Sequence, residues 1–257
     1  MPDDVLTARD GHVATVTLNR PEKRNALTTG MIARLHAELE PLAADGDVRV
    51  VILRAEGNAF CAGLDLRELA EQRAAGVAET HTLEEALQVL EALPQPTIAA
   101  VQGDAVAGGC ELALHCDLRV VSETARLGMP LARIGLVAPF PLAAKIVETV
   151  GPAWARQILL TGAPVDGRRA FEMGLVHQVA PPAGVEAAAE ALARQVAGNA
   201  PLSLAGMKAA VLRAVALREQ IPHADLDELA RRARTSADAS EGRRAMLDKR
   251  RPVFRGA

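Results

Sequence analysis

Short apolar runs alternate with stretches of helical spacing over about the first 180 residues of the chain. In residues 12–18, His-Val-Ala-Thr-Val-Thr-Leu, polar and apolar side chains change face with a period of two, which predicts a strand. Residues 48–53 form a continuously apolar run, which is typical of a strand buried on both faces. The runs at 97–101 and 117–121 predict two further core strands.

Helical spacing follows several of these runs. Thr28 or Thr29 can cap a helix, because apolar residues recur at helical intervals after them, at Met31, Ile32, Leu35, Leu39 and Leu42. Residues 108–116 predict a second helix, which a glycine pair opens. After Pro181-Pro182, residues 183–198, 202–218 and 223–248 have helical periodicity and no strand signal. The alternation of strands and helices predicts an α/β core, followed by an all-helical region from about residue 183.

Composition narrows the function classes. The 257 residues are 49% hydrophobic and 24% charged, with a net charge of −3, and they contain no Tyr and one Trp. A nucleic-acid partner usually requires a basic surface and aromatic platforms, so we expect none. Cys61, Cys110 and Cys116 are odd in number and lack metal-like spacing, so we expect reduced thiols and a cytoplasmic protein. Neither a signal peptide nor a membrane-spanning segment is predicted.

Two glycine-containing loops each join a predicted strand to a helix. They are residues 57–66, Gly-Asn-Ala-Phe-Cys-Ala-Gly-Leu-Asp-Leu, and residues 103–112, Gly-Asp-Ala-Val-Ala-Gly-Gly-Cys-Glu-Leu. A helix start presents unpaired N–H groups to an anion, and glycine allows a ligand oxygen to approach the backbone. Either loop alone is typical of an ordinary tight turn. If the two loops converge, they form an oxyanion hole.

Together these loops resemble the two signatures of the enoyl-CoA hydratase/isomerase (crotonase) family. Arg20 to Leu27 resembles that family's CoA-binding turn, and residues 248–254, Asp-Lys-Arg-Arg-Pro-Val-Phe, resemble its closing segment. The resemblance extends over nearly the whole chain. It implies a spiral of repeated β-β-α units, with residues 1–182 as the acyl-CoA-binding core and residues 183–257 as a helical oligomerisation region. It also implies a homotrimer or homohexamer.

The resemblance implies a role for each matching residue. The N–H groups of Leu64 and Gly108 are expected to bind the thioester oxygen, and the substrate is a coenzyme A thioester, with no further cofactor and no metal. Residues expected along the CoA path are Lys23, Arg24, Ala62, Asp65, Leu66 and Lys249. The three basic residues among them can equally be solvated surface charges.

Glu111 is the acid best situated for chemistry. It lies one helical turn after Gly108, where a carboxylate can move protons or hold water beside a bound thioester. A glutamate at this position can also simply favour the helix dipole. Because Glu111 matches the family's first catalytic glutamate, we predict that it is the acid/base.

The position of the family's second catalytic glutamate differs in this chain. The segment reads Gly128-Met129-Pro130-Leu131, so Leu131 occupies the acid's place, and leucine neither donates nor accepts a proton. Residues 138–141, Ala-Pro-Phe-Pro, replace a glycine-rich run of the family with a stiffer one. Hydration by two carboxylates is therefore open to question.

Three functions follow as hypotheses. The first is an enoyl-CoA hydratase-like lyase in which Glu111 activates or positions water. The second keeps the enolate but uses one acid, as an enoyl-CoA isomerase, a decarboxylase or a thioester hydrolase. The third is an acyl-CoA-binding protein with little catalysis. The cluster of Cys110, Glu111, His115 and Cys116 superficially suggests a metal site, but no second ligand group follows at zinc-like spacing.

Overall fold

The computed structural model describes residues 3–75, 82–216 and 221–256. Contacts between Cα atoms divide the chain into two compact units. The first unit comprises Met1–Leu127 and Val165–Leu212, and the second comprises Gly128–Pro164 and Arg213–Ala257. Both units are therefore assembled from segments that are far apart in the sequence.

The first unit contains the sheets. Its strands are β1 (Val5–Asp10), β2 (Val13–Leu18), β3 (Val50–Ala55), β4 (Ala59–Cys61), β5 (Thr97–Val101), β6 (Asp104–Val106), β7 (Leu118–Ser122), most of β8 (Arg126–Gly128), β9 (Val165–Asp166) and β10 (Gln178–Ala180). Its helices are α1 (Thr29–Leu39), α2 (Leu66–Ala75), α3 (Leu83–Ala92), α4 (Gly108–His115), α6 (Gly167–Glu172), α7 (Val185–Ala197) and most of α8 (Pro201–Val215). Three short 3-10 turns are η1 (Pro21–Lys23), η2 (Glu40–Ala44) and η4 (Pro182–Gly184).

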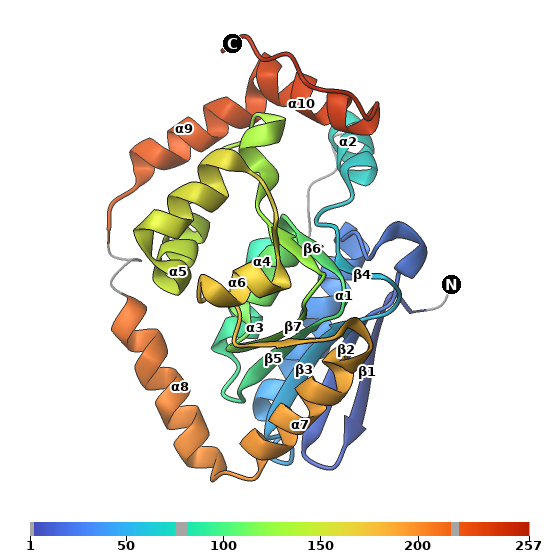
Figure 1. Ribbon diagram of the computed structural model, residues 1–257, viewed down its shortest axis with the longest axis vertical. Coiled ribbons are helices and arrows are strands. Elements are labelled where there is room, and N and C mark those ends of the chain that lie inside the picture. Colours follow the sequence, from blue (N-terminus) through green and yellow to red (C-terminus); the bar gives the residue numbers. More distant parts are fainter. Residues whose placement is uncertain (1–2, 76–81, 217–220, 257) are drawn as a thin grey trace. The chain divides into compact units, whose positions relative to one another are not determined.

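A six-stranded sheet forms the centre of this unit, in the order β1-β2-β3-β5-β7-β10. Only β1 and β2 pair antiparallel, and the remaining neighbours are parallel. Helix α7 packs on one face, as Figure 1 shows beside β2 and β3. There Ala189 and Ala193 of α7 contact a buried cluster that includes Ile52 and Ile98. Small alanine side chains let the helix approach the sheet closely, which explains the alanine-rich sequence of this segment.

A second, four-stranded sheet has the order β4-β6-β8-β9. Strands β4 and β6 pair in parallel through Ala59 and Asp104 and through Cys61 and Ala105. Each of these two strands has only three residues, and each follows a strand of the large sheet. The small sheet therefore brings together the two glycine-containing loops, because β4 lies within one loop and β6 within the other.

The second unit contains η3 (Pro130–Ile134), α5 (Phe140–Thr161), α9 (Ala224–Thr235) and α10 (Ala237–Leu247). Helix α5 kinks at Gly151, whose φ is 73°, directly before Pro152. The backbone of Ile134 in η3 packs closely against Gly242 of α10, where a Cβ would lie 2.5 Å from the Ile134 carbonyl carbon. Glycine at residue 242 is therefore needed for this contact.

The α/β fold expected from the sequence is confirmed, with small differences at element ends. The strand expected over 48–53 covers Val50–Ala55, and the one expected over 117–121 covers Leu118–Ser122. Helix α1 is capped by Thr28, whose hydroxyl accepts the N–H of Met31 at 3.0 Å. The described residues of 190–250 contain no strand, while positions 217–220 lie outside the described residues. The assignment of residues 183–257 to oligomerisation stays a prediction.

One helical prediction needs correction. Residues 223–248 form two helices, because Ser236 has extended backbone angles, φ −69° and ψ 159°. Its hydroxyl accepts the N–H of Ala239 at 3.0 Å and so begins α10. A serine at the N-cap, directly before the first residue of a helix, accepts an otherwise unpaired N–H, which explains the break at Ser236. Within the part of the chain that is described, no helix has the length and apolar character needed to cross a membrane.

Candidate active site

The two glycine-containing loops meet in the first unit. Gly63 has a φ of 91°, and a Cβ there would lie 3.2 Å from the Gly108 nitrogen and 3.0 Å from the Val106 carbonyl oxygen. A Cβ on Gly109 would lie 2.2 Å from the carbonyl oxygen of Cys61. No side chain fits at these positions. The two loops, whose convergence the sequence left as a condition, therefore do meet, and their contact is between backbone atoms.

Two peptide N–H groups at this junction, those of Leu64 and Gly108, have no acceptor among the described residues. Leu27 bridges Leu64 in parallel, with Leu27 N–H donating to the Gly63 oxygen at 2.8 Å and Asp65 N–H donating to the Leu27 oxygen at 2.8 Å. This pairing uses the groups on either side of Leu64 and leaves the Leu64 N–H outside it. Gly108 begins α4, so its N–H has no partner within the helix. Among the described residues, neither N–H donates to another group of the chain.

Ala107 adds backbone strain at this point. Its φ of 52° and ψ of −122° are unusual for a residue with a Cβ. Such strain, of order 1–3 kcal/mol, persists where the surrounding structure fixes a particular backbone geometry. Here the strained residue determines the orientation of the peptide that carries the Gly108 N–H.

Glu111 lies in the first turn of α4, and its own N–H donates to the Ala107 oxygen at 3.0 Å. Its side chain is partly buried, and the carboxylate has no hydrogen-bond partner among the described residues. Burial raises the pKa of Glu111 to about 7, and repulsion from the Glu84 carboxylate adds to this rise. Near neutral pH the group therefore exists in both protonation states, as a group that transfers protons requires.

The N-terminal turn is built around a buried asparagine. Arg24 and Asn25 have positive φ values of 54° and 53°. The Asn25 amide donates to the carbonyl oxygens of Glu56 and Ala59, both at 2.8 Å. These bonds tie the turn to the first glycine-containing loop. Lys23 is exposed, and Arg24 donates to Asp104 at 2.9 Å, so the structure orients Arg24 toward β6.

Asp65 has a structural role that the sequence did not reveal. Arg20, which was not among the predicted site residues, donates to Asp65 at 2.9 Å and also to the Ala26 oxygen at 2.9 Å. Burial alone would raise the pKa of Asp65, but the bonds from Arg20 and from the N–H groups of Glu68 and Arg67 outweigh it, and the pKa is lowered. Asp65 therefore stays ionised and joins the N-terminal turn to the start of α2. Ala62 and Leu66 lie within the first glycine-containing loop and are partly exposed.

The remaining predicted residues belong to the second unit. Leu131 lies in η3, and its carbonyl oxygen accepts the N–H of Leu136 at 2.9 Å. Lys249 follows α10 with a φ of 54° and is exposed. Their roles at the substrate stay predictions.

The cysteines lie close to the loops. Cys61 ends β4, Cys110 is in the first turn of α4, and Cys116 follows α4, and all three are buried. Burial raises the pKa of Cys61 and of Cys116 to about 12 each, so both thiols stay protonated. His115 contacts the backbone oxygen of Glu111 at 2.8 Å through Nδ1. Among the described residues, no group of three or more His, Cys, Asp or Glu side chains is arranged to hold a metal.

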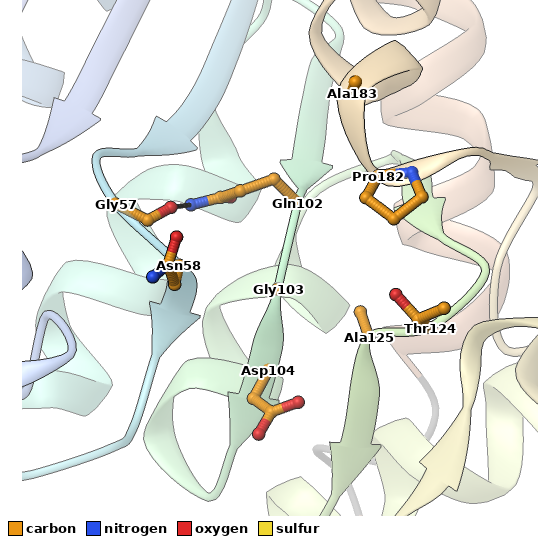
Figure 2. A pocket seen from close by; sticks show the side chains of 9 residues that line it. All are labelled: Gly57, Asn58, Gln102, Gly103, Asp104, Thr124, Ala125, Pro182 and Ala183. Carbon is orange, nitrogen blue, oxygen red and sulfur yellow. Dashed lines mark hydrogen bonds between the residues drawn. The ribbon is translucent and has the colours of Figure 1, made fainter.

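A separate polar cleft of about 480 Å³ lies at the carboxyl ends of four parallel strands of the large sheet (Figure 2). The Gln102 amide reaches Gly57 across it and also donates to the Ala55 oxygen. Neither Glu111 nor the Leu64 and Gly108 pair lines this cleft. It is formed by Gly57 and Asn58 after β3, Gln102, Gly103 and Asp104 after β5, Thr124 and Ala125 after β7, and Pro182 and Ala183 after β10.

The sequence profile of the enoyl-CoA hydratase/isomerase family matches residues 8–257. The chain belongs to this family. A putative enoyl-CoA hydratase of Thermus thermophilus is 41% identical over 97% of this chain and 100% of its own length. Membership in the enoyl-CoA hydratase/isomerase family makes the protein an acyl-CoA enzyme.

Solved structures agree with this assignment. A carnitinyl-CoA hydratase from Mycobacterium avium superposes with a TM-score of 0.89 at 32% identity, covering 100% of both chains. A methylmalonyl-CoA decarboxylase superposes with a TM-score of 0.87 at 25% identity, covering 99% of both chains. Enzymes with different reactions therefore share this fold, and the site residues must decide the reaction.

Proposed function

We propose that the protein adds water to the conjugated double bond of an enoyl-CoA thioester. In this reaction the N–H groups of Leu64 and Gly108 bind the thioester oxygen, and Glu111 is the acid/base. The observation that carries the proposal is the combination of two adjacent N–H groups without protein acceptors and a carboxyl group with a pKa of about 7 one turn away. The reaction needs no metal and no further cofactor.

The oxyanion pair would act when the enolate forms. As water adds to the β carbon, negative charge develops on the thioester oxygen, and two fixed N–H donors stabilise that charge without reorganising. The start of α4 adds a partial positive charge at the same point. Glu111 exchanges a proton at the α carbon, for which a pKa near neutrality is well matched.

The CoA path is proposed to run beside the same loops. Ala62, Asp65 and Leu66 are the residues of the first loop proposed to border it. Lys23 and Arg24 extend from the N-terminal turn that Asn25 ties to this loop, which supports a place for them near the nucleotide part. Lys249 is the proposed phosphate contact from the closing segment.

A second candidate is a reaction that needs one acid only, such as double-bond isomerisation, decarboxylation or thioester hydrolysis. The observation that favours it is Leu131, an apolar residue at the position of the family's second catalytic glutamate. The structural likeness to a methylmalonyl-CoA decarboxylase is consistent with it. An acyl-CoA-binding protein with little turnover is the third possibility.

Loss of enoyl-thioester absorbance with crotonyl-CoA tests the choice in wild type, Glu111→Gln and Leu131→Glu. Fast wild-type hydration that Glu111→Gln abolishes would support the hydratase. If wild-type hydration is slow and Leu131→Glu makes it faster, the wild-type protein lacks a second acid at residue 131 that hydration needs. Slow turnover in all three proteins, with CoA binding retained in calorimetry, would favour the second or third candidate.

A homotrimer or homohexamer is proposed as the assembly. Helix α8 exposes large apolar side chains, with Leu202 89% exposed, Met207 67% and Val211 63%. Apolar surface of this kind is stabilised when a partner covers it. Light scattering at micromolar concentration tests the assembly, and a monomer mass would contradict it.

A further inference from the structure

The first turn of α3 borders the junction of the two glycine-containing loops. Leu83 is the first residue of α3, and its Cδ2 atom lies 2.9 Å from where a Cβ on Gly108 would be. The same Cβ would lie 3.5 Å from the Cα of Gly63. Leu83 therefore contacts the backbone that carries the proposed oxyanion donors. The residue that follows Leu83 is Glu84.

Helix α3 uses the neighbouring glutamate for its own cap. The Thr82 hydroxyl accepts the N–H of Glu85 at 3.2 Å, and the Glu85 carboxylate accepts the N–H of Thr82 at 2.9 Å. This reciprocal pair satisfies two donors at the start of the helix. Glu84 takes no part in it. No hydrogen bond or ion pair joins Glu84 to another described residue, and its side chain is exposed.

Glu84 nevertheless acts on Glu111. Burial is the main cause of the raised pKa of Glu111, and repulsion from the negative charge of Glu84 is the second cause. Helices α3 and α4 pack against each other, and both carboxylates stand in the first turn of their helices. A nearby like charge disfavours the charged form of a carboxylate, and this effect fits two carboxylates carried by the first turns of packed helices.

The other titratable groups on the elements around Glu111 are buried, take part in hydrogen bonds or ion pairs, or lie at the far end of α3. On α4 itself, His115 contacts a backbone oxygen, and Cys110 is buried. Cys61 of β4 is a buried, protonated thiol, and Asp104 of β6 is paired with Arg24 and Arg126. On α3, Glu85 belongs to the cap and Glu91 lies in the last turn of the helix.

We propose that Glu84 is the second carboxylate of the active site and takes the place of the acid missing at Leu131. This inference rests on the proposed hydration. In the step, the oxygen of water bonds to the β carbon while the Glu84 carboxylate accepts a proton from that water. The π electrons move to the thioester oxygen as the enolate, which the Leu64 and Gly108 N–H groups bind. Protonated Glu111 then protonates the α carbon, and the proton on Glu84 returns to Glu111 through solvent.

The two environments suit this division of work. Glu84 is exposed, so water can reach its carboxylate, as a base that activates water needs. Glu111 is partly buried beside that charge, which favours its protonated form, as an acid needs. Pairs of carboxyl groups held in different protonation states are a common arrangement for acid/base catalysis.

The test compares Glu84→Gln with the matched control Glu85→Gln, since glutamine can keep the capping bonds of residue 85. Hydration of crotonyl-CoA is expected to fall by about 100-fold or more in Glu84→Gln, with unchanged CoA binding and an unchanged melting temperature. Glu85→Gln should keep wild-type hydration. Glu84→Asp should recover part of the lost rate.

Two further readouts separate a catalytic role from a structural one. Exchange of the α protons of butyryl-CoA in deuterium oxide needs Glu111 and the oxyanion donors but no attacking water, so Glu84→Gln should retain it. The alkaline limb of kcat/KM should move to lower pH in Glu84→Gln, because Glu111 loses its proton more easily once the neighbouring charge is gone. Glu85→Gln should leave that limb in place.

The outcomes also separate this inference from the proposed function. If Glu111→Gln abolishes hydration while Glu84→Gln keeps the wild-type rate and pH profile, Glu84 is not the second carboxylate and the hydratase proposal stands. If the wild-type protein neither hydrates crotonyl-CoA nor exchanges butyryl-CoA protons, both proposals are wrong. Equal loss of hydration in Glu84→Gln and Glu85→Gln would identify a structural role of the α3 start and overturn the inference.

Discussion

Gly109 faces the carbonyl oxygen of Cys61 so closely that a Cβ on Gly109 would lie 2.2 Å from that oxygen. The contact joins the start of α4 to the end of β4, and the atom that a Cβ would strike belongs to the backbone of Cys61. The two loops that carry the proposed oxyanion donors can therefore pack this closely only because Gly109 has no side chain.

Gly109→Ala should separate these loops. We expect a loss of several kcal/mol in the free energy of unfolding, because overpacking against fixed backbone costs about 1–3 kcal/mol and sometimes more. CoA-thioester binding should weaken as well. Gly30→Ala in α1 is the control, since its new Cβ would meet only the Thr28 hydroxyl at 3.9 Å. Denaturant unfolding and calorimetry measure both effects, and equal stability of the two variants would contradict the packing argument.

The backbone of Leu64 gives a second prediction. Leu64→Pro removes the N–H donor and should lose about 2.7–4 kcal/mol of transition-state stabilisation, the scale of one oxyanion donor. Leu64→Ala keeps the N–H and should preserve much of the thioester binding. The measurement is kcat/KM for crotonyl-CoA, with circular dichroism to verify the fold. A folded proline variant with wild-type activity would remove Leu64 from the site.

The raised pKa of Glu111 gives a prediction for stability. Because the folded-state pKa of about 7 lies above the ordinary glutamate value, its contribution to stability is present at low pH and is lost as pH rises to about 7. Glu111→Gln does not ionise, so its stability relative to wild type should increase between pH 5 and pH 8 by on the order of 2 kcal/mol. Chemical denaturation at several pH values measures this, with Glu71→Gln on the exposed face of α2 as the control. A constant difference across that range would contradict it.

The C-terminal segment depends on one carboxylate of α10. Glu241 accepts bonds from Arg250 at 2.9 Å, from Arg244 at 2.7 Å and from the Val253 N–H at 3.1 Å. The bond from Arg250 is the largest cause that holds the pKa of Glu241 well below its usual value. The attachment is therefore present above the ordinary glutamate pKa and is lost only as pH falls through the lowered value.

Glu241→Gln should accordingly expose the basic stretch that follows α10. Trypsin is expected to cleave after Lys249 and Arg250 faster in this variant, at neutral pH, than in wild type. Glu228→Gln on α9, whose carboxylate bonds only Arg231 of its own helix, should retain the wild-type cleavage rate. Mass spectrometry of the fragments measures the difference, and equal rates in both variants would show that Glu241 does not hold the segment.

Local patterns in the sequence were sufficient for much of the fold. β5 was found at its observed bounds and β2 to within one residue, and Thr28 was one of the two residues proposed as the cap of α1. These features depend on side-chain periodicity or on a single capping residue. Each is therefore visible within a short window of sequence.

Other features could not be predicted in this way. Strands β4 and β6 have three residues each, which is too short for any periodicity. Ala107, which has a positive φ, packs close to Gly63, and Gly63 is far away in the sequence. Arg20 was noted only as the first residue of the CoA-binding turn, and Glu84 belongs to no motif. Asp65 and Glu111, on which they act, come near them only after folding. A search for acidic residues within the first turn of each predicted helix would have found Glu84 as a candidate.

The buried cysteines allow separation of the two loops to be measured through the rate of thiol labelling. Cys61 lies within one loop, at the end of β4, and Cys110 lies within the other, in the first turn of α4. Burial raises the pKa of the Cys61 thiol and keeps it protonated. A thiol reagent can reach Cys61 only after its loop has moved away from α4. The labelling rate of Cys61 thus reports how often the loops separate. A thioester that binds to both loops should slow the labelling of Cys61 in proportion to the fraction of protein that has bound it.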